Sequence, residues 1–218
     1  INLLSTQYRW SNGILRYKTK EELARNWADN LFRMNRTELE GREITDTELS
    51  RLIDELDRLR TPFEINNLLT GTIITLNRDN GKAVKLKIFD RLHVGGGTSH
   101  YQIAQQPVFK KDDPEDRDHR GDFTLLINGM PVVHVELKRS GRSWTEAVNQ
   151  IETYSKKRVF TGIFRFVQLF VAMNPEEMRY FANPGEDSTL DHNYCFEWKD
   201  FNNNPCKGWK NIANSFLS

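Results

Sequence analysis

The sequence predicts an α/β protein in which a mixed central sheet is flanked by helices. Two observations carry this prediction. Amphipathic helical segments with capping signals fill the first part of the chain, to about residue 60, and short apolar, β-rich runs with one further capped helix follow. With 218 residues, 38% of them hydrophobic, the chain is long enough for one large domain, or one and a half ordinary ones, with a real core.

Charge and cysteine usage narrow the class of protein. The formal net charge is +1, so any basic surface for nucleic acid must be local. Cys195 and Cys206 lie far apart and without metal-ligand spacing, which favours a reduced, cytoplasmic protein. The most apolar segment, Ile163 to Met173, is interrupted by Arg165 and Gln168 and is too short to cross a bilayer, so we expect no membrane association.

Two helices are expected near the amino terminus. Residues 20–35 place one apolar stripe on a helix, formed by Leu23, Trp27, Leu31 and Met34. A second helix begins at a capping box, Thr45 to Glu48, and continues with a leucine-rich stripe as far as Leu59. Its acidic positions are predicted to form a solvated face: Asp54, Glu55 and Asp57.

Strands are expected after Pro62. The stretch "GTIITLNRDNGKAVKLKIFD" places a turn at Asp79-Asn80-Gly81 between two β-rich runs, and "YQIAQQPVFK" predicts a further strand. His93–Gly97 and the charge-dense segment from Lys110 to Arg120 are predicted to be loops. Later, "FRFVQLFVAM" predicts a buried strand, residues 194–198 a short one, and the tail an Asn-rich linker followed by a weakly helical piece.

The hairpin "GDFTLLINGMPVVHVELKRSG" collects charged residues at one end. Because side chains alternate along a strand, His134, Glu136 and Lys138 share one face, and Asp122 on the preceding strand can reach them. A two-residue turn on Asn128-Gly129 alone would throw Asp122 to the opposite face. We therefore predict either a loop with an odd number of residues, most simply Asn128-Gly129-Met130, or a β-bulge.

Two carboxylates held close together in a poorly solvated site repel each other, and a divalent cation removes the conflict. Oxygen ligands completed by waters and a substrate phosphate describe a Mg²⁺ site, and a neighbouring lysine can orient a water or offset charge. The set fits hydrolysis of a phosphodiester. The alternative is that Asp122, Glu136 and Lys138 are edge charges that close two strands.

A helix is expected to follow the hairpin, beginning at a capping box formed by Ser143 and Glu146. Gln150 and Tyr154 are four residues apart and so lie on one helical face, where both polar tips can reach the same site. The alternative is an ordinary amphipathic helix with a polar edge. Its core stripe would be Ala147, Val148 and Ile151.

These residues carry a resemblance to a known family. "INGMPVVHVELK", "EAVNQIETYSK", "VQLFVAMN" and "RYFAN" resemble the amino-terminal nuclease domain of the R (motor) subunit of type I restriction endonucleases. That domain belongs to the PD-(D/E)xK nucleases with an added Gln-x-x-x-Tyr motif. The resemblance is strong from about Ala83 to Asn183 and loose before it.

The resemblance implies a fold and a set of site residues. The fold would be restriction-endonuclease-like. Asp122, Glu136 and Lys138 match the catalytic positions, and Asp122 with Glu136 would bind Mg²⁺. Gln150 and Tyr154 match the Gln-x-x-x-Tyr pair, which would support DNA positioning and the active site.

The resemblance also implies a function and partners. Residues 1–198 would form a nuclease domain, helical up to about residue 60, that cuts double-stranded DNA; residues 199–218 would lead to a motor outside this chain. Methylation and specificity subunits would be its partners. ATP would bind only in the motor, because the chain lacks a G-x-x-x-x-G-K-[ST] motif. Two alternatives stay open: an inactive module of the same fold that docks DNA or subunits, and a repair nuclease.

Some residues depart from the family pattern or fit it in two ways. Gly121 stands where the motif has proline, and the usual acidic residue on an early helix has no match, Glu48 being a poor one. His134 is interpreted as a packed residue rather than a catalytic one. Two basic groups are open between phosphate contacts and solvated charge: Lys110, Lys111, Arg117 and Arg120, and Lys156, Lys157 and Arg158.

Overall fold

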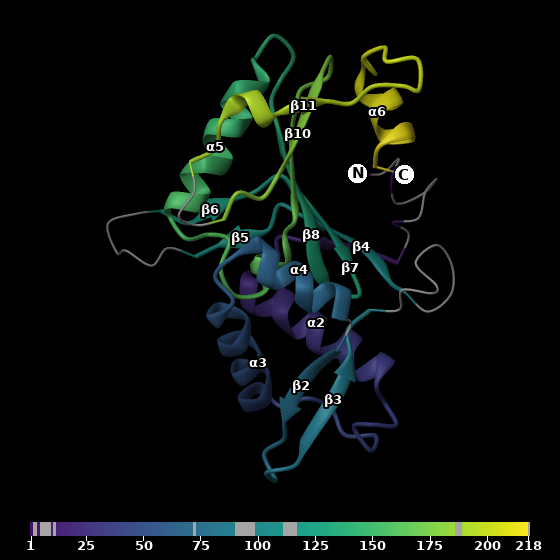
Figure 1. Ribbon diagram of the computed structural model, residues 1–218, viewed down its shortest axis with the longest axis vertical. Coiled ribbons are helices and arrows are strands. Elements are labelled where there is room, and N and C mark those ends of the chain that lie inside the picture. Colours follow the sequence, from purple (N-terminus) through teal and green to yellow (C-terminus); the bar gives the residue numbers. More distant parts are fainter. Residues whose placement is uncertain are drawn as a thin grey trace.

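The computed structural model describes residues 1, 4, 10, 12–71, 73–89, 99–110, 117–185 and 189–217. A mixed seven-stranded sheet runs through the middle of the molecule (Figure 1). The helices α2, α3 and α4 and the hairpin of β2 and β3 gather at one end, and α5 and α6 lie at the other (Figure 1). This confirms the α/β class with a mixed central sheet flanked by helices. The predicted loop at His93–Gly97 lies outside the described residues.

The elements have the following bounds. The sheet contains, in spatial order, β1 (Ile14–Arg16), β4 (Tyr101–Gln105), β7 (Phe123–Ile127), β8 (Met130–Leu137), β9 (Leu169–Met173), β10 (Met178–Ala182) and β11 (Phe196–Glu197). Two small ribbons pair β2 (Ile73–Asn77) with β3 (Ala83–Lys87), and β5 (Val108–Phe109) with β6 (His119–Arg120). The helices are α2 (Lys20–Met34), α3 (Asp46–Arg58), α4 (Pro62–Gly71), α5 (Trp144–Lys156) and α6 (Trp209–Ser215), with 3₁₀ turns η2 (Gly162–Phe166) and η3 (His192–Tyr194).

Strand direction follows from the connections. Neighbours β7 and β8 are antiparallel and joined by a tight hairpin, whereas β8 and β9 are parallel. A parallel pair needs a long crossover, and α5 with η2 supplies it. The strand β1 also pairs in parallel with β4, so the sheet is mixed. No helix in the described part of the chain is both long and apolar enough to cross a membrane.

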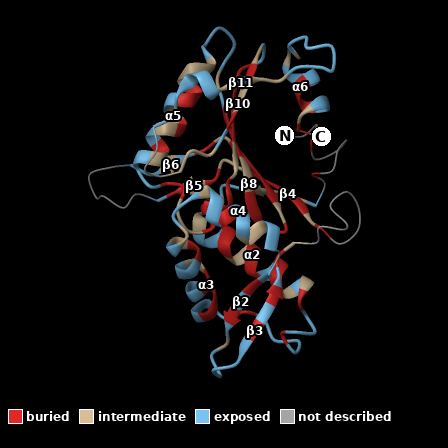
Figure 2. Ribbon diagram, viewed as in Figure 1, coloured by how far each residue is buried: buried red, intermediate tan, exposed pale blue. Residues whose placement is uncertain are grey.

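The sheet buries both faces. Along β9, Phe170 and Ala172 pack into a core shared with α2, α3 and α5, while Val171 and Met173 pack into a second core that includes residues of α6. The buried residues follow the central strands (Figure 2). This alternation is what period-two side-chain placement requires of a strand covered on both sides.

The first two predicted helices are confirmed. Leu23, Trp27 and Leu31 of α2 are fully buried. Helix α3 begins after Thr45, which forms the predicted capping box with Glu48. Asp57 of the predicted solvated face is only partly exposed. Its carboxylate accepts a hydrogen bond from Arg165 Nε at 2.6 Å and one from the Gly162 backbone N–H at 2.8 Å. It therefore links α3 to the crossover.

The expectation of strands directly after Pro62 was wrong, because α4 occupies Pro62–Gly71. Proline fits the first position of a helix, where no backbone donor is needed. Thr61 accepts from the Glu64 backbone N–H at 3.3 Å, and the Glu64 carboxylate accepts from the Thr61 N–H at 2.9 Å. The cap and the proline therefore start a helix here, and the predicted β2–β3 hairpin follows it.

Three further segments differ in detail from the sequence prediction. His119–Arg120, expected in a loop, forms β6 against β5. The first three residues of "FRFVQLFVAM", 164–166, are part of η2, and only Leu169–Met173 is strand. The late strand is confirmed in a shorter form, as β11. In the tail, Ile212 and Ala213 of α6 are buried against the second core.

The β7–β8 hairpin resolves the question of register. Ile127 pairs with Met130 across Asn128-Gly129, so the turn has two residues. Both turn residues have positive φ, 51° and 81°, as a type I′ turn requires. The register then shifts between Leu125 and Leu126, whose partners are Val133 and Pro131, so Val132 is the extra residue of a β-bulge. The bulge, not the odd-length loop, brings Asp122 to the face of Glu136.

Candidate active site

The candidate site lies where β7 begins and β8 ends. Glu136 is fully buried on β8, and Asp122, directly before β7, is half-buried. The Asp122 carboxylate accepts a hydrogen bond from the Leu137 backbone N–H at 2.7 Å, which fixes it against the neighbouring strand. Lys138 follows β8, and its backbone N–H donates to the Met173 carbonyl of β9 at 2.8 Å. Three of the predicted site residues are thus brought to one corner of the sheet.

The two carboxyl groups are electrostatically coupled. Burial, and second the negative charge of Glu136, raise the pKa of Asp122 to about 6. Burial raises the pKa of Glu136 to about 7, against the opposing effects of a hydrogen bond with Asp122 and the charge of Lys138. Without a cation, the site therefore holds a proton near neutral pH.

One carboxylate oxygen of the ionised site has no hydrogen-bond donor among the described residues. Glu136 Oε1 lies 2.9 Å from His134 Nε2, whereas no described N–H or O–H group donates to the buried Oε2 when both carboxyl groups are ionised. A buried carboxylate oxygen left unsatisfied is costly, and a bound cation would satisfy it. In the described part of the chain, no group of three or more His, Cys, Asp or Glu side chains forms a ready metal cage. Two carboxylates fit Mg²⁺, which keeps several waters and takes substrate phosphate oxygens.

The lysine is positioned by α5. Lys138 Nζ donates a short hydrogen bond to Gln150 Oε1, and Gln150 Nε2 donates to the Tyr154 hydroxyl at 2.7 Å. That hydroxyl donates in turn to the Arg120 carbonyl of β6 at 2.8 Å. Burial, followed by the charge of Glu136, raises the pKa of Tyr154 to about 12, so it stays a donor. Gln150 and Tyr154 therefore face the site, as predicted.

Helix α5 is built to present these two side chains. Val148 and Ile151 are buried, and the helix contacts β8 and β9. The face of α5 that carries these two residues is therefore packed on the sheet. Ser143 caps the helix by accepting from the Thr145 backbone N–H at 3.2 Å. The predicted capping box with Glu146 was wrong, because the Glu146 carboxylate pairs with Arg142 instead.

His134 is packed, as expected, and it also contacts the site. Its ring is fully buried, with Phe160 at 5.2 Å and Phe170 at 6.3 Å between ring centroids. Its Nδ1 lies 2.9 Å from Thr124 Oγ1 and its Nε2 lies 2.9 Å from Glu136 Oε1. Sequence reasoning did not give Thr124 a role. The signal was available, since the bulged register places Thr124 directly opposite His134.

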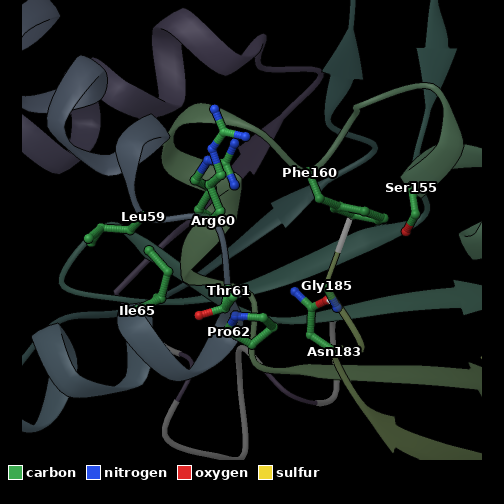
Figure 3. Close-up of a pocket in the computed structure, with 10 residues that line it drawn as sticks. Leu59, Arg60, Thr61, Pro62, Ile65, Ser155, Phe160, Asn183 and Gly185 are labelled. Carbon is green, nitrogen blue, oxygen red and sulfur yellow. The ribbon is translucent and has the colours of Figure 1, made fainter. Parts of the chain in front are cut away.

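A small cavity lies next to this cluster. Phe160 lines it, together with residues of the α3–α4 connection such as Arg60 and Thr61 (Figure 3). Its volume is about 20 Å³, enough for about one water molecule. Neither predicted carboxylate is among the described residues that line it, so the cavity is separate from the candidate site.

Glu48 does not supply the missing acidic residue of an early helix. It is buried in α3, where its carboxylate pairs with Arg78 Nε at 2.9 Å and accepts from the Asp79 backbone N–H at 2.9 Å. These contacts tie α3 to the β2–β3 hairpin. Glu48 therefore has a structural role.

The sheet order, the bulged hairpin and the acid-acid-lysine corner together define a restriction-endonuclease-like α/β protein. Comparison with known proteins agrees. Residues 4–189 match the model of the type I restriction enzyme R protein N terminus. The chain belongs to this family.

Individual relatives cover most of this chain. It is 34% identical over 200 residues, 92% of the chain, to the SauMSSORF170P type I restriction enzyme endonuclease subunit of Staphylococcus aureus (strain MSSA476), of which the match covers 20%. It is 29% identical over 141 residues, 64% of the chain and 43% of the relative, to the type I restriction enzyme EcoprrI endonuclease subunit of Escherichia coli. The chain thus spans about a fifth of the length of the staphylococcal relative.

Proposed function

We propose that this domain cleaves double-stranded DNA in a Mg²⁺-dependent reaction, as the nuclease part of a type I restriction enzyme R subunit. The observation that carries the proposal is the pairing of Asp122 with Glu136, whose Oε2 is buried and unsatisfied, beside an oriented lysine. Membership of the R protein family supports it, because the relatives are named endonuclease subunits.

Each residue has a distinct role in the proposed reaction. Asp122, held by the Leu137 N–H, and Glu136 would bind the cation through their oxygens. The cation, when bound, would supply a nucleophilic water and stabilise negative charge on a phosphoryl oxygen. Lys138 would orient the attacking water or offset the developing charge, and Gln150 would keep its ammonium group in place.

DNA would approach from the side on which Asp122 and Lys138 reach the surface. Exposed basic residues lie near β6 and at the end of α5, the two elements whose residues form the hydrogen-bond chain from Lys138 to the Arg120 carbonyl. They are Lys110, Arg117 and Arg120 around β5 and β6, and Lys156, Lys157 and Arg158 at the end of α5. Such groups bind phosphates without reading sequence. Site recognition would fall to specificity and methylation subunits, and ATP hydrolysis to a motor outside these residues.

The proposal is tested by Glu136→Ala and Lys138→Ala in the reconstituted complete enzyme, with linear DNA product and ATP turnover measured side by side. We expect cleavage to fall at least 100-fold in both variants, as an order of magnitude, since each removes a group that acts on the reacting phosphate. ATP turnover should persist. Matched controls are Glu55→Ala and Lys82→Ala, which break exposed ion pairs with Arg58 and Glu40.

The outcomes separate the alternatives. Normal cleavage by Glu136→Ala would refute the catalytic assignment. Loss of ATP turnover together with cleavage would instead indicate that the hairpin is structural. If the unmodified chain gains no stability from Mg²⁺ or Mn²⁺, the domain is a docking module of the same fold.

A further inference from the structure

We propose that His134 is a positioning residue that holds the Glu136 carboxylate in its metal-binding orientation, with Thr124 fixing the ring and Gly121 leaving space for it. This inference rests on the proposed function, since it concerns how that site is held. It adds three residues to the site: Thr124, His134 and Gly121.

The hydrogen bonds form a directed chain. Thr124, His134 and Glu136 are all fully buried, and the two contacts are 2.9 Å each. A carboxylate that binds a cation has no proton to give, so His134 Nε2 must carry the hydrogen and donate to Glu136 Oε1. In a neutral imidazole, Nδ1 is then an acceptor, and the Thr124 hydroxyl donates to it. The chain therefore selects one tautomer and one ring orientation.

The ring cannot easily leave this position. Aromatic rings surround it, with centroids at 5.2 Å for Phe160, 6.3 Å for Phe170, 6.4 Å for Phe109 and 6.5 Å for Tyr154. Rotation of the ring would bury both nitrogens against carbon atoms and leave them without partners, which costs free energy. The cage and the two hydrogen bonds thus act together.

Gly121 packs directly against the His134 ring, in addition to the four aromatic rings. A Cβ at this position would lie 2.7 Å from His134 Cε1, closer than side-chain atoms pack, and 3.3 Å from Phe109 Cε2, a tight contact. The backbone of Gly121 is not in the left-handed region, so only the neighbouring rings forbid a side chain. A side chain added at position 121 would therefore press on the imidazole of His134.

The two oxygens of Glu136 therefore have different roles in the site. Oε1 is occupied by His134, and no group among the described residues donates to Oε2. A side chain fixed in this way has little rotational freedom to lose when a cation binds. Hydrogen-bonded partners of metal ligands typically account for 10- to 100-fold in affinity.

The test is calorimetric titration of Mn²⁺ into the 218-residue chain. We expect His134→Leu, which keeps the packing volume but removes the donor, to weaken Mn²⁺ binding about 10-fold or more. His134→Gln places an amide nitrogen near the position of Nε2, so it should stay within about threefold of the wild type. Thermal unfolding of the metal-free variants reports folding separately from metal binding.

Gly121→Ala supplies an independent test that leaves the imidazole in the chain. Its Cβ should displace the ring and weaken Mn²⁺ binding, again about 10-fold. In the His134→Leu background the same substitution should cause little further loss, because the positioning contact is already gone. Additive losses in the double variant would overturn the proposal. Should His134→Leu fail to fold, Gly121→Ala decides alone, and unchanged Mn²⁺ binding would overturn it.

Glu136→Ala distinguishes the two proposals. If it abolishes Mn²⁺ binding while His134→Leu binds as tightly as the wild type, only the positioning role falls. Equal weakening by His134→Leu and His134→Gln would also overturn that role, because packing would then explain both. If Glu136→Ala leaves Mn²⁺ binding unchanged, the cation is held elsewhere and both proposals fall.

Discussion

Glu136 shares the electrostatic cost of the site with Asp122, and it is the more deeply buried of the two. Its carboxyl group is fully buried, and burial raises its pKa from an ordinary 4.5 to about 7. In the unfolded chain the group ionises freely near its ordinary pKa. The folded, metal-free protein therefore binds a proton that the unfolded chain has already released, and this difference links stability to pH.

The expected result is a pH-dependent gain in stability for Glu136→Gln without metal. Because the folded-state pKa is raised, the contribution of Glu136 is fully favourable below about pH 4.5 and is lost as pH rises through about 7. The neutral amide has no such loss. The variant's unfolding free energy should exceed that of the wild type increasingly from pH 5 to pH 8, by a few kcal/mol in order of magnitude.

Urea denaturation in the presence of a chelator measures this difference. Glu55→Gln, at an exposed ion pair with Arg58, is the matched control and should show little pH-dependent difference. Adding Mg²⁺ above pH 7 should stabilise the wild type and not Glu136→Gln. A difference between Glu136→Gln and wild type that does not change with pH would contradict the burial of this charge.

Residue spacing together with the family resemblance selected the five predicted site residues, and the structure brings all of them together. Asp122, Glu136, Lys138, Gln150 and Tyr154 lie in one connected cluster. Their catalytic roles stay predictions. Thr124, the partner of His134 on β7, was missed, although the predicted register that sets Asp122 opposite Glu136 also sets Thr124 opposite His134.

At the scale of elements, the β7–β8 hairpin is held in place by helix α2. Gly129 has φ 81°, and a Cβ there would lie 2.6 Å from the Trp27 Cα. Gly81, in the β2–β3 hairpin, has nearly the same φ, 82°, but open space around it. Substituting these two glycines therefore distinguishes the cost of a left-handed backbone from the cost of a steric clash with α2.

We expect Gly81→Ala to lower the unfolding free energy by about 1 kcal/mol, the cost of left-handed backbone for a residue with a Cβ. Gly129→Ala should cost at least about 2 kcal/mol more, because the turn or α2 must also move. Thermal or urea unfolding of the two variants gives the comparison. Equal losses would show that the packing of Gly129 on α2 contributes nothing to stability.

Elements were predictable where one local signal dominated. Periodicity and capping boxes located α2 and α3, and Asp79-Asn80-Gly81 located the β2–β3 turn. Helix α4 was missed although Thr61, Pro62 and Glu64 carry a start signal, because its apolar and asparagine residues show no helical stripe. The two-residue strand β6 was missed because it forms only by pairing with β5, so local pattern defines it poorly.

At the scale of the whole molecule, positive charge is gathered in local clusters although the net charge of the chain is small. The net charge is +1, yet Lys156, Lys157 and Arg158 stand exposed together directly after α5. Each phosphate contact that a protein makes with DNA steepens the salt dependence of binding by about one. This gives the proposed DNA surface a measurable signature.

Replacing these three residues with glutamine should weaken binding to DNA and reduce the salt dependence, by up to about three in log–log slope. The control replaces the exposed residues Arg36, Lys82 and Lys85. Lys85 lies on β3, and Asn35, next to Arg36, is hydrogen-bonded to Lys87 of the same strand. Strand β3 lies at the far end of the molecule from α5 (Figure 1). Fluorescence anisotropy with a duplex at several salt concentrations measures both. Equal effects of the two triple variants would mean that binding follows total charge and not this surface.

The central claim is that Asp122 and Glu136 hold a divalent cation, and anomalous scattering from crystals grown with Mn²⁺ tests it most directly. We expect one strong anomalous peak between the two side chains, about 2.1 Å from Glu136 Oε2 and from an Asp122 oxygen. The peak should be absent in Glu136→Ala crystals grown in the same way. A wild-type structure at saturating Mn²⁺ that lacks this peak, and in which the Asp122 and Glu136 carboxyl groups are hydrogen-bonded to each other, would contradict the claim.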